Sequence, residues 1–346
     1  MKAKLLQKKI IFLLLGACLL AVFLLLFFVR EQPFQDPFPG SNSVLPEELE
    51  EREQQAFAKP VNHGSYKPLV YLLTLEDDYL MPITLALQAE KEGNELAGWL
   101  MEQLFGWPYP NLARSPVPEG MPMPEVTLSQ ERATLNFPAL PPNLTISSVE
   151  ESFFIKSLVL TLTEIPQIKE VSFLLEGKES EAIFGYTDTS APLKRPSSIN
   201  LAEEDLSAGT PVRVWFGDSQ ALFAVPLTFV STVEGDYPTR FALEKLLEGP
   251  PAGSALTPVV PQGTTLKGLR VQEKLLEADF SRELIDNHMG GSTGEAQTLR
   301  CLVLTATEAL QGLELQILIE GEIVDSLAGH FLISRPLPRE TVNLLP

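Results

Sequence analysis

Residues 158–164 (LVLTLTE) and 302–308 (LVLTATE) differ at one position and lie 144 residues apart. Similarity at a fixed spacing is the sequence signature of a duplicated structural unit. Other segments match in the same order at a spacing of 143 or 144, namely Gly106-Trp107-Pro108 with Gly249-Pro250-Pro251, Pro118-Glu119-Gly120 with Pro261-Gln262-Gly263, ATLNF at 133–137 with LEADF at 276–280, and Glu176-Gly177 with Glu320-Gly321. We therefore predict two copies of one domain, which we name repeat 1 (residues 68–200) and repeat 2 (residues 209–346).

Each repeat has the apolar periodicity of a small α+β domain. The elements predicted in repeat 2 are strands at 213–216 and 221–230, a helix at 239–248, a strand at 276–280, a helix at 299–310 and a strand at 315–319. The strand at 276–280 alternates apolar with acidic residues, as a half-buried strand does, and the helix at 299–310 has apolar residues at helical spacing. We expect each domain to be a mixed or antiparallel sheet with two helices on one face.

An apolar run at residues 10–29 precedes the repeats. Twenty residues of helix span about 30 Å, the thickness of the hydrocarbon layer of a membrane. Lysines precede the run and acidic residues follow it, so the positive-inside rule places residues 1–9 in the cytoplasm and both repeats outside. We predict a single-pass signal anchor at the cell membrane, followed by an acidic, proline-rich linker at residues 30–67.

A lipoprotein signal is the alternative interpretation of the same segment. Residues 15–18 (LGAC) resemble a bacterial lipobox, whose cysteine is lipidated after cleavage. A lipobox cysteine stands at the end of the apolar stretch, whereas a further apolar run at 19–29 follows Cys18. The length of the run favours the anchor and leaves lipidation of Cys18 as the alternative.

The composition argues against several classes of function. The chain has 45 acidic and 26 basic residues and a net charge of −19. Nucleic acid is therefore not an expected partner, because its phosphates are bound by basic surfaces. Two cysteines and three histidines are too few for a disulfide scaffold and argue against a Cys/His zinc site. Since no phosphate-binding or dinucleotide motif is present either, we expect no cofactor.

Residues 290–295 (GGSTGE) contain G-x-S-x-G, the pattern of the nucleophile elbow of hydrolases. In that interpretation Ser292 would be the nucleophile. An elbow needs a strand directly before its serine, but residues 281–289 (SRELIDNHM) are polar. Ser292 and Glu295 instead fit a capping box, in which the serine and the glutamate pair with backbone amides at the start of a helix.

Repeat 1 provides an independent test of this motif. At a spacing of 144 the serine and the glutamate return as Ser148 and Glu151, while the glycines matching Gly290, Gly291 and Gly294 are absent. A strained elbow could not lose its glycines, whereas a helix cap does not need them. We therefore predict a structural motif with no catalytic residue, and a protein that is not an enzyme.

Repeat 2 resembles the GerM domain, which is named for sporulation and spore germination proteins. The resemblance is carried by Leu247, Gly249, Pro250, Pro251, Pro261, Gly263, Asp279, Phe280, Ser281, the GGSTGE motif, Leu302, Val303, Thr305, Thr307, Glu308 and Gly321. Repeat 1 keeps Gly106, Pro108, Pro118, Gly120, Phe137, Thr161, Thr163 and Glu164, and is a degenerate copy.

The resemblance implies a membrane-attached protein with tandem domains outside the cytoplasmic membrane of a spore-forming bacterium. It also implies a part in an envelope assembly that links mother cell and forespore, with domains similar to ring-building motifs. The implied partners are envelope or sporulation proteins, or further copies of the chain. The same domain occurs in lipoproteins outside sporulation, so a module that binds peptidoglycan or a small ligand is the alternative function.

Overall fold

The computed structural model describes residues 67–76, 79–86, 91–202, 209–231 and 238–345, all within one compact unit, Val44–Pro346. The predicted anchor, Cys18 and nearly all of the predicted linker lie outside these residues. Within the described ranges, no helix has both the length and the apolar character needed to cross a membrane.

The two repeats share the order strand, strand, helix, strand, strand, helix, strand, to which repeat 1 adds two short strands at its end and repeat 2 a short helix before its second long helix. Repeat 1 contains β1 (Leu69–Leu73), β2 (Leu80–Thr84), α3 (Gly93–Phe105), β3 (Glu125–Ser129), β4 (Arg132–Phe137), α4 (Ser148–Leu162), β5 (Glu170–Leu175), β6 (Lys178–Glu179) and β7 (Leu193–Lys194). Repeat 2 contains β8 (Thr210–Gly217), β9 (Ala224–Ser231), α5 (Pro238–Glu248), β10 (Leu266–Gln272), β11 (Leu275–Phe280), α6 (Glu283–Asp286), α7 (Ser292–Ala306) and β12 (Glu314–Ile319). The predicted α+β class and the tandem arrangement are confirmed.

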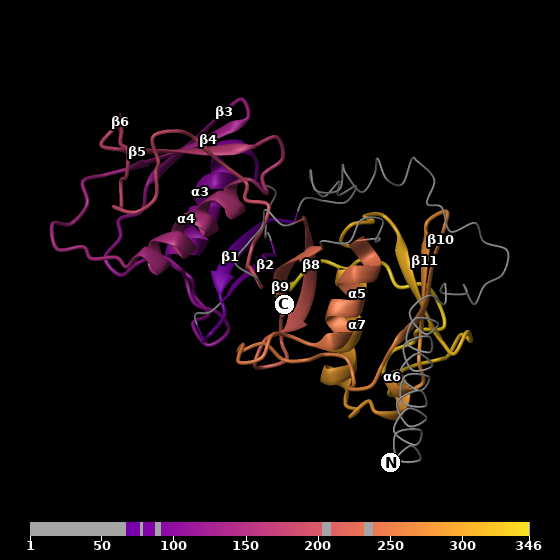
Figure 1. The fold of residues 1–346 in the computed structure, drawn as a ribbon. Coiled ribbons are helices and arrows are strands. Elements are labelled where there is room, and N and C mark those ends of the chain that lie inside the picture. Colours follow the sequence, from indigo (N-terminus) through magenta and orange to yellow (C-terminus); the bar gives the residue numbers. More distant parts are fainter. Residues whose placement is uncertain (1–66, 77–78, 87–90, 203–208, 232–237, 346) are drawn as a thin grey trace, which may run out of the picture. The chain divides into compact units, whose positions relative to one another are not determined.

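Each repeat is built in three layers (Figure 1). The first two strands form an antiparallel hairpin, β1–β2 or β8–β9. The helices lie between that hairpin and a second, mixed sheet, in which β4 and β5, or β11 and β12, run parallel. A parallel pair needs a long crossover connection, and α4 and α7 supply it. The hairpin as a separate layer is a feature that the predicted single sheet did not include.

The threonine of the duplicated LVLT stretch joins the second helix to the hairpin. Thr161 Oγ1 accepts a hydrogen bond from the backbone N–H of Tyr71 in β1 at 3.1 Å. Thr305 Oγ1 accepts the equivalent bond from the N–H of Trp215 in β8 at 3.0 Å. Both threonines are buried. Each threonine provides a hydrogen-bond acceptor for a backbone N–H at the edge of the first strand. A buried N–H without an acceptor would lower the free energy of unfolding.

Two buried asparagines connect the repeats across β2 and β9. Asn200 Nδ2 donates to the carbonyl of Leu80 in β2 (2.7 Å) and to that of Pro226 in β9 (2.6 Å). Its Oδ1 accepts from the N–H of Leu80 at 2.9 Å. The Asn200 side chain therefore binds both the backbone N–H and the carbonyl of Leu80 in repeat 1. It also binds the carbonyl of Pro226 in repeat 2.

Asn343 makes the same three contacts with the repeats exchanged. Its Nδ2 donates to the carbonyls of Ala224 and Pro82, both at 2.8 Å. Its Oδ1 accepts from the N–H of Ala224 at 2.8 Å. The residues after each asparagine pair with the opposite repeat, because Leu201 bridges Thr228 and Leu344 bridges Thr84. Each side-chain hydrogen bond of the asparagines, and the bridge that follows each of them, thus occurs twice.

The junction predicts that Asn343→Ala lowers the free energy of unfolding by about 1–3 kcal/mol, because buried carbonyl and N–H groups lose their partners. Urea unfolding of the purified chain would measure it. Asn287→Ala is the control, since that exposed side chain donates one hydrogen bond to Gln262. Equal stability of the Asn343→Ala and Asn287→Ala variants would contradict the role of the junction.

Candidate functional site

The GGSTGE motif forms the turn that leads into α7. Gly290 and Gly291 have φ values of +76° and +83°, which lie in the left-handed region that favours glycine. Gly291 is the N-cap of α7 and makes no side-chain capping bond, and Ser292 is the first helical residue. The capping box predicted for Ser292 and Glu295 is therefore wrong. Glu295 reaches loop groups of the chain rather than the N-cap amide.

Repeat 1 does contain a capping box, displaced by one residue from the prediction. The N-cap of α4 is Ser147, whose Oγ accepts from the N–H of Glu150 at 3.2 Å. The Glu150 carboxylate accepts from the N–H of Ser147 at 2.9 Å. The Ser147 hydroxyl also donates to this carboxylate at 2.6 Å, and the bonds from the hydroxyl and the N–H of Ser147 hold the pKa of Glu150 below its usual value. The predicted pair, Ser148 and Glu151, is thus corrected to Ser147 and Glu150.

This assignment predicts that Ser147→Ala lowers the free energy of unfolding by about 1 kcal/mol. Ser148→Ala and Ser292→Ala should change it little, because neither serine caps a helix. Thermal or urea unfolding of the three variants would measure the difference. A Ser292→Ala loss as large as that of Ser147→Ala would contradict the assignment.

Glu295 is fully buried and fastens a loop that follows β12. Its carboxylate accepts hydrogen bonds from the backbone N–H groups of Leu327 (3.0 Å), Ala328 (3.1 Å) and His330 (2.9 Å). The Nδ1 atom of His330 lies 3.0 Å from the same carboxylate. The glutamate of the motif therefore acts as the internal acceptor for a loop that begins about thirty residues later in the chain.

Glu151 does the same in repeat 1. It is also fully buried, and its carboxylate accepts from the backbone N–H groups of Tyr186 (3.1 Å) and Thr187 (2.5 Å). Sequence reasoning found the right pair of glutamates, Glu151 and Glu295, but assigned them the wrong partners. A helix-capping pattern can be recognised from neighbouring residues. The backbone amides that these glutamates bind cannot be recognised from the sequence, because every residue except proline carries one.

Two histidines that no sequence pattern connects, His288 and His330, lie near Glu295. His330 contacts Glu295, as described above. His288 Nδ1 accepts from the N–H of Gly290 at 3.2 Å, and its Nε2 lies 3.1 Å from Thr298 Oγ1. Burial lowers the pKa of His288, the Glu295 charge opposes that shift and His330 adds to it. In the part of the chain described, Ser292 makes no side-chain hydrogen bond to either histidine.

The Glu295 carboxylate predicts a specific acid response. Burial raises its pKa, but the hydrogen bonds from the loop outweigh burial and hold the pKa below the ordinary value of 4.5. As the pH falls, the unfolded chain takes up this proton first, so the stabilisation is complete above the ordinary pKa and is lost progressively as the pH falls from about 4.5 through the lower pKa of the folded state. Glu295→Gln should flatten this dependence and cost about 1–3 kcal/mol at pH 7, measured by urea unfolding.

The control for this prediction is Glu322→Gln, a substitution of an exposed glutamate in the same repeat. It should leave both the stability and its pH dependence close to those of the unsubstituted chain. A Glu295→Gln variant with an unchanged acid response would show that the loop bonds do not stabilise the folded state.

The glutamate that ends each duplicated stretch lies in a second buried polar cluster. Glu308 binds Arg213 and Arg339, and its carboxylate accepts from Trp215 Nε1 at 3.1 Å. Burial raises the pKa of Glu308, but the two arginines outweigh burial and lower it. In repeat 1, Glu164 binds Arg195 and accepts from Tyr71 Oη at 2.8 Å. These groups join the first strand, the end of the second helix and the segment after the sheet, so their role is structural.

The remaining candidates do not form a reactive centre. Cys301 is buried, and burial raises the pKa of its thiol to about 12, which leaves an inert core thiol. Among the described residues, no group of His, Cys, Asp and Glu side chains is arranged to hold a metal ion.

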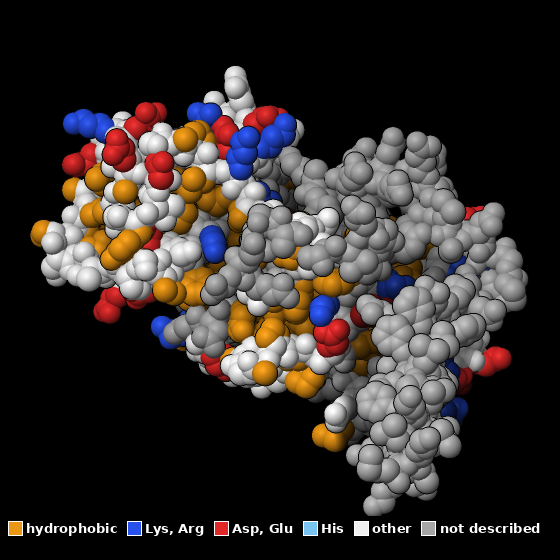
Figure 2. Space-filling view, in the orientation of Figure 1, with side chains coloured by type: hydrophobic (Ala, Val, Ile, Leu, Met, Phe, Trp, Pro, Cys, Tyr) orange, Lys and Arg blue, Asp and Glu red, His pale blue; other side chains and the backbone are white. Residues whose placement is uncertain are grey.

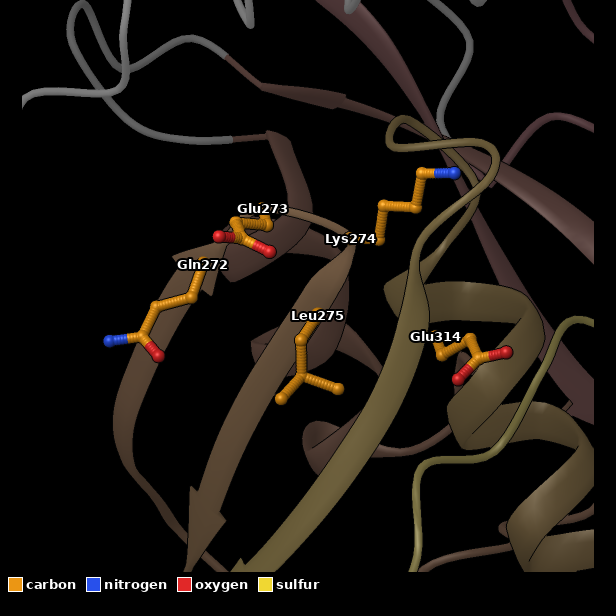
Figure 3. A pocket seen from close by; sticks show the side chains of 5 residues that line it. All are labelled: Gln272, Glu273, Lys274, Leu275 and Glu314. Atoms are coloured by element: carbon orange, nitrogen blue, oxygen red, sulfur yellow. The ribbon is translucent and has the colours of Figure 1, made fainter.

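A surface depression lies at the turn between β10 and β11. It is lined by Gln272, Glu273, Lys274, Leu275 and Glu314. Figure 3 shows that these side chains point in different directions and do not converge on one place. Ligand pockets combine concave apolar walls with convergent polar groups, and this depression lacks that convergence.

The larger sheets end in strands that pair on one side only. In the described ranges β3 pairs with β4 alone and β10 with β11 alone. The edge of β3 is partly occupied, because Leu128 N–H donates to Asn94 Oδ1 at 2.6 Å. Unpaired strand edges are sites at which another chain can add a strand. On the face drawn in Figure 2, charged side chains of both signs are interspersed over the β3–β5 sheet and form no extended basic surface.

A family model described as sporulation and spore germination, Germane, matches residues 69–181 and 213–325. The chain belongs to the Germane family. The two matches fall in the two repeats that the LVLT stretches predicted. Asn200 and Asn343 lie outside both matches, whereas the strand residues that they bind in β2 and β9 lie inside them.

A solved structure of two tandem domains shows the same fold. The tandem GerMN domains of the sporulation protein GerM from Bacillus subtilis match with a TM-score of 0.60 and 20% identity, covering 80% of this chain and 99% of that one. A putative lipoprotein from Clostridium perfringens shares 26% identity over 40% of this chain and 94% of its own, with a TM-score of 0.28. No curated protein matches the chain.

Proposed function

We propose that this Germane protein is a non-enzymatic, membrane-anchored component of an extracytoplasmic assembly in sporulation or spore germination, with both repeats outside the cytoplasmic membrane. The proposal depends most on the hydrogen bonds that the glutamates of the motif make. In both repeats Glu151 and Glu295 bind loop amides of their own chain, so the one catalytic-looking motif serves the fold.

Protein interaction is the role that this architecture supports best. Membership of the Germane family supports a role in sporulation or spore germination. Strands that pair on one side only support the docking of other chains at their free edges. The partners we propose are envelope or sporulation proteins, or further copies of the chain. Binding of peptidoglycan or a small ligand ranks second, because the depression at the β10–β11 turn lacks convergent polar groups.

Residues 10–29 provide the proposed attachment to the cell membrane. The alternative attachment, a lipid on Cys18, would follow cleavage of the segment before it. Intact mass spectrometry of the membrane-extracted protein distinguishes the two. The anchor keeps the full mass, whereas lipidation removes the first seventeen residues and adds acyl mass.

Deletion of the gene should lower the yield of heat-resistant spores or delay germination in the bacterium that encodes the chain. The full chain and its Ser292→Ala variant should restore the phenotype equally, because Ser292 has no catalytic role in this proposal. Crosslinking in sporulating cells should recover envelope or sporulation proteins.

Two results would contradict the proposal. A deletion strain that sporulates and germinates normally would contradict the proposed role in sporulation or germination. A stable Ser292→Ala chain that fails to complement would point to chemistry at the motif rather than docking.

A further inference from the structure

Three large apolar side chains are exposed on two segments that contact the first turns of α7, one through His288 and the other through His330. Met289 precedes the glycine turn, and Phe331 and Leu332 follow His330 in the fastened loop. Their exposed fractions are 101%, 42% and 63%. We name these three residues the apolar tip. Exposed apolar groups on a folded domain mark interaction surfaces when they lie together.

Hydrogen bonds hold both segments of the apolar tip on the first turns of α7. His330, next to Phe331, is bound to Glu295 through its backbone N–H and its ring. His288, next to Met289, lies against Thr298 one turn further along α7. A surface that is already ordered loses little conformational entropy when a partner binds it. The tip is thus presented on a fixed scaffold.

Repeat 1 keeps the scaffold but not the tip. Glu151 fastens its loop as Glu295 does in repeat 2. At the spacing of 144, however, Met289, Phe331 and Leu332 correspond to Thr145, Thr187 and Asp188. The apolar side chains are therefore not required by the fold, since the same loop is held in repeat 1 with polar residues at these positions.

Acidic residues flank the apolar tip along the sequence. Glu283 lies before Met289, and Glu322 and Asp325 lie before Phe331, all of them exposed. Asp325 is next to the tip, because its carbonyl accepts from the N–H of Ile333 at 2.8 Å. The other acidic groups nearby are neutralised in the Arg282–Asp286 and Lys267–Glu320 pairs. Among the described residues Glu322 and Asp325 form no ion pair and outnumber the exposed Arg335, while the Glu283 carboxylate is hydrogen-bonded to Ser281.

We propose that the apolar tip docks a segment of a partner protein that presents apolar side chains flanked by lysine or arginine. This inference rests on the proposed function and names the surface and the chemistry of its partner. Anionic lipid is disfavoured as the occupant by the same acidic rim. Charge complementarity at the rim steers association, while the apolar contacts supply the affinity.

Photocrosslinking with the full chain in its native membrane tests the proposal. A photoreactive phenylalanine replaces Leu332 in one variant and Tyr186 in another. Tyr186 is the matched control, because it is 65% exposed and occupies the equivalent loop of repeat 1. The probe at 332 should crosslink to a protein segment whose sequence, read by mass spectrometry, contains apolar residues beside lysine or arginine. The probe at 186 should not capture that segment.

Charge reversal at the rim provides the second measurement. Glu322→Lys together with Asp325→Lys should lower the crosslink yield at 332 by about tenfold, because steering by opposite charge raises association rates by that factor or more. Glu176→Lys, at an exposed position of repeat 1, is the control and should leave the yield unchanged.

Crosslinks at 332 to lipid, to an acidic segment or to nothing would overturn the proposal, as would a yield that charge reversal leaves unchanged. These results are distinguishable from failure of the proposed function. A deletion strain that sporulates and germinates normally would contradict the proposed function itself. A deletion phenotype together with crosslinks to envelope proteins elsewhere on the chain would contradict only the assignment of the apolar tip as the docking surface.

Discussion

Proline in the middle of two strands sets the main constraint on how the repeats join. Pro82 in β2 and Pro226 in β9 have no backbone N–H, so each can join the opposite repeat only through its carbonyl, which needs a donor from that repeat. Asn200 and Asn343 supply those donors from side chains. Since each asparagine also pairs with both polar groups of a residue in its own repeat, the two domains share one buried polar junction within a common hydrophobic core.

Within each domain, side chains of the second helix make the contacts that join the layers. Its threonine pairs with the edge of the first strand, the glutamate after its end binds arginine, and the glutamate in its first turn fastens a distant loop. These are the positions at which the two repeats agree in sequence. The two repeats therefore have the same residues where the fold needs a polar contact, and they have different residues on the surrounding surface.

Local patterns in the sequence were sufficient for the duplication, the order of elements and the α+β class. The LVLT stretches predicted both second helices because apolar spacing is a property of neighbouring residues. The contacts of Glu295 could not be predicted, because its partners are backbone amides about thirty residues away. The cap of α4 was displaced by one residue, since Ser147 and Ser148 fit the pattern equally well. The asparagines of the junction do repeat, as Asn200-Leu201 and Asn343-Leu344 at a spacing of 143, but no pattern identifies their acceptors, because these are carbonyl groups that every residue carries.

The reciprocity of Asn200 and Asn343 has a consequence for how the halves can diverge. An interface in which each side offers the same donors and acceptors is the arrangement that two identical subunits use around a twofold axis. In such a pair any substitution is made twice, on both subunits at once. When both halves belong to one polypeptide, a change at position 332 leaves position 188 untouched. One half can therefore acquire its own binding surface while the other remains a partner that keeps the core intact.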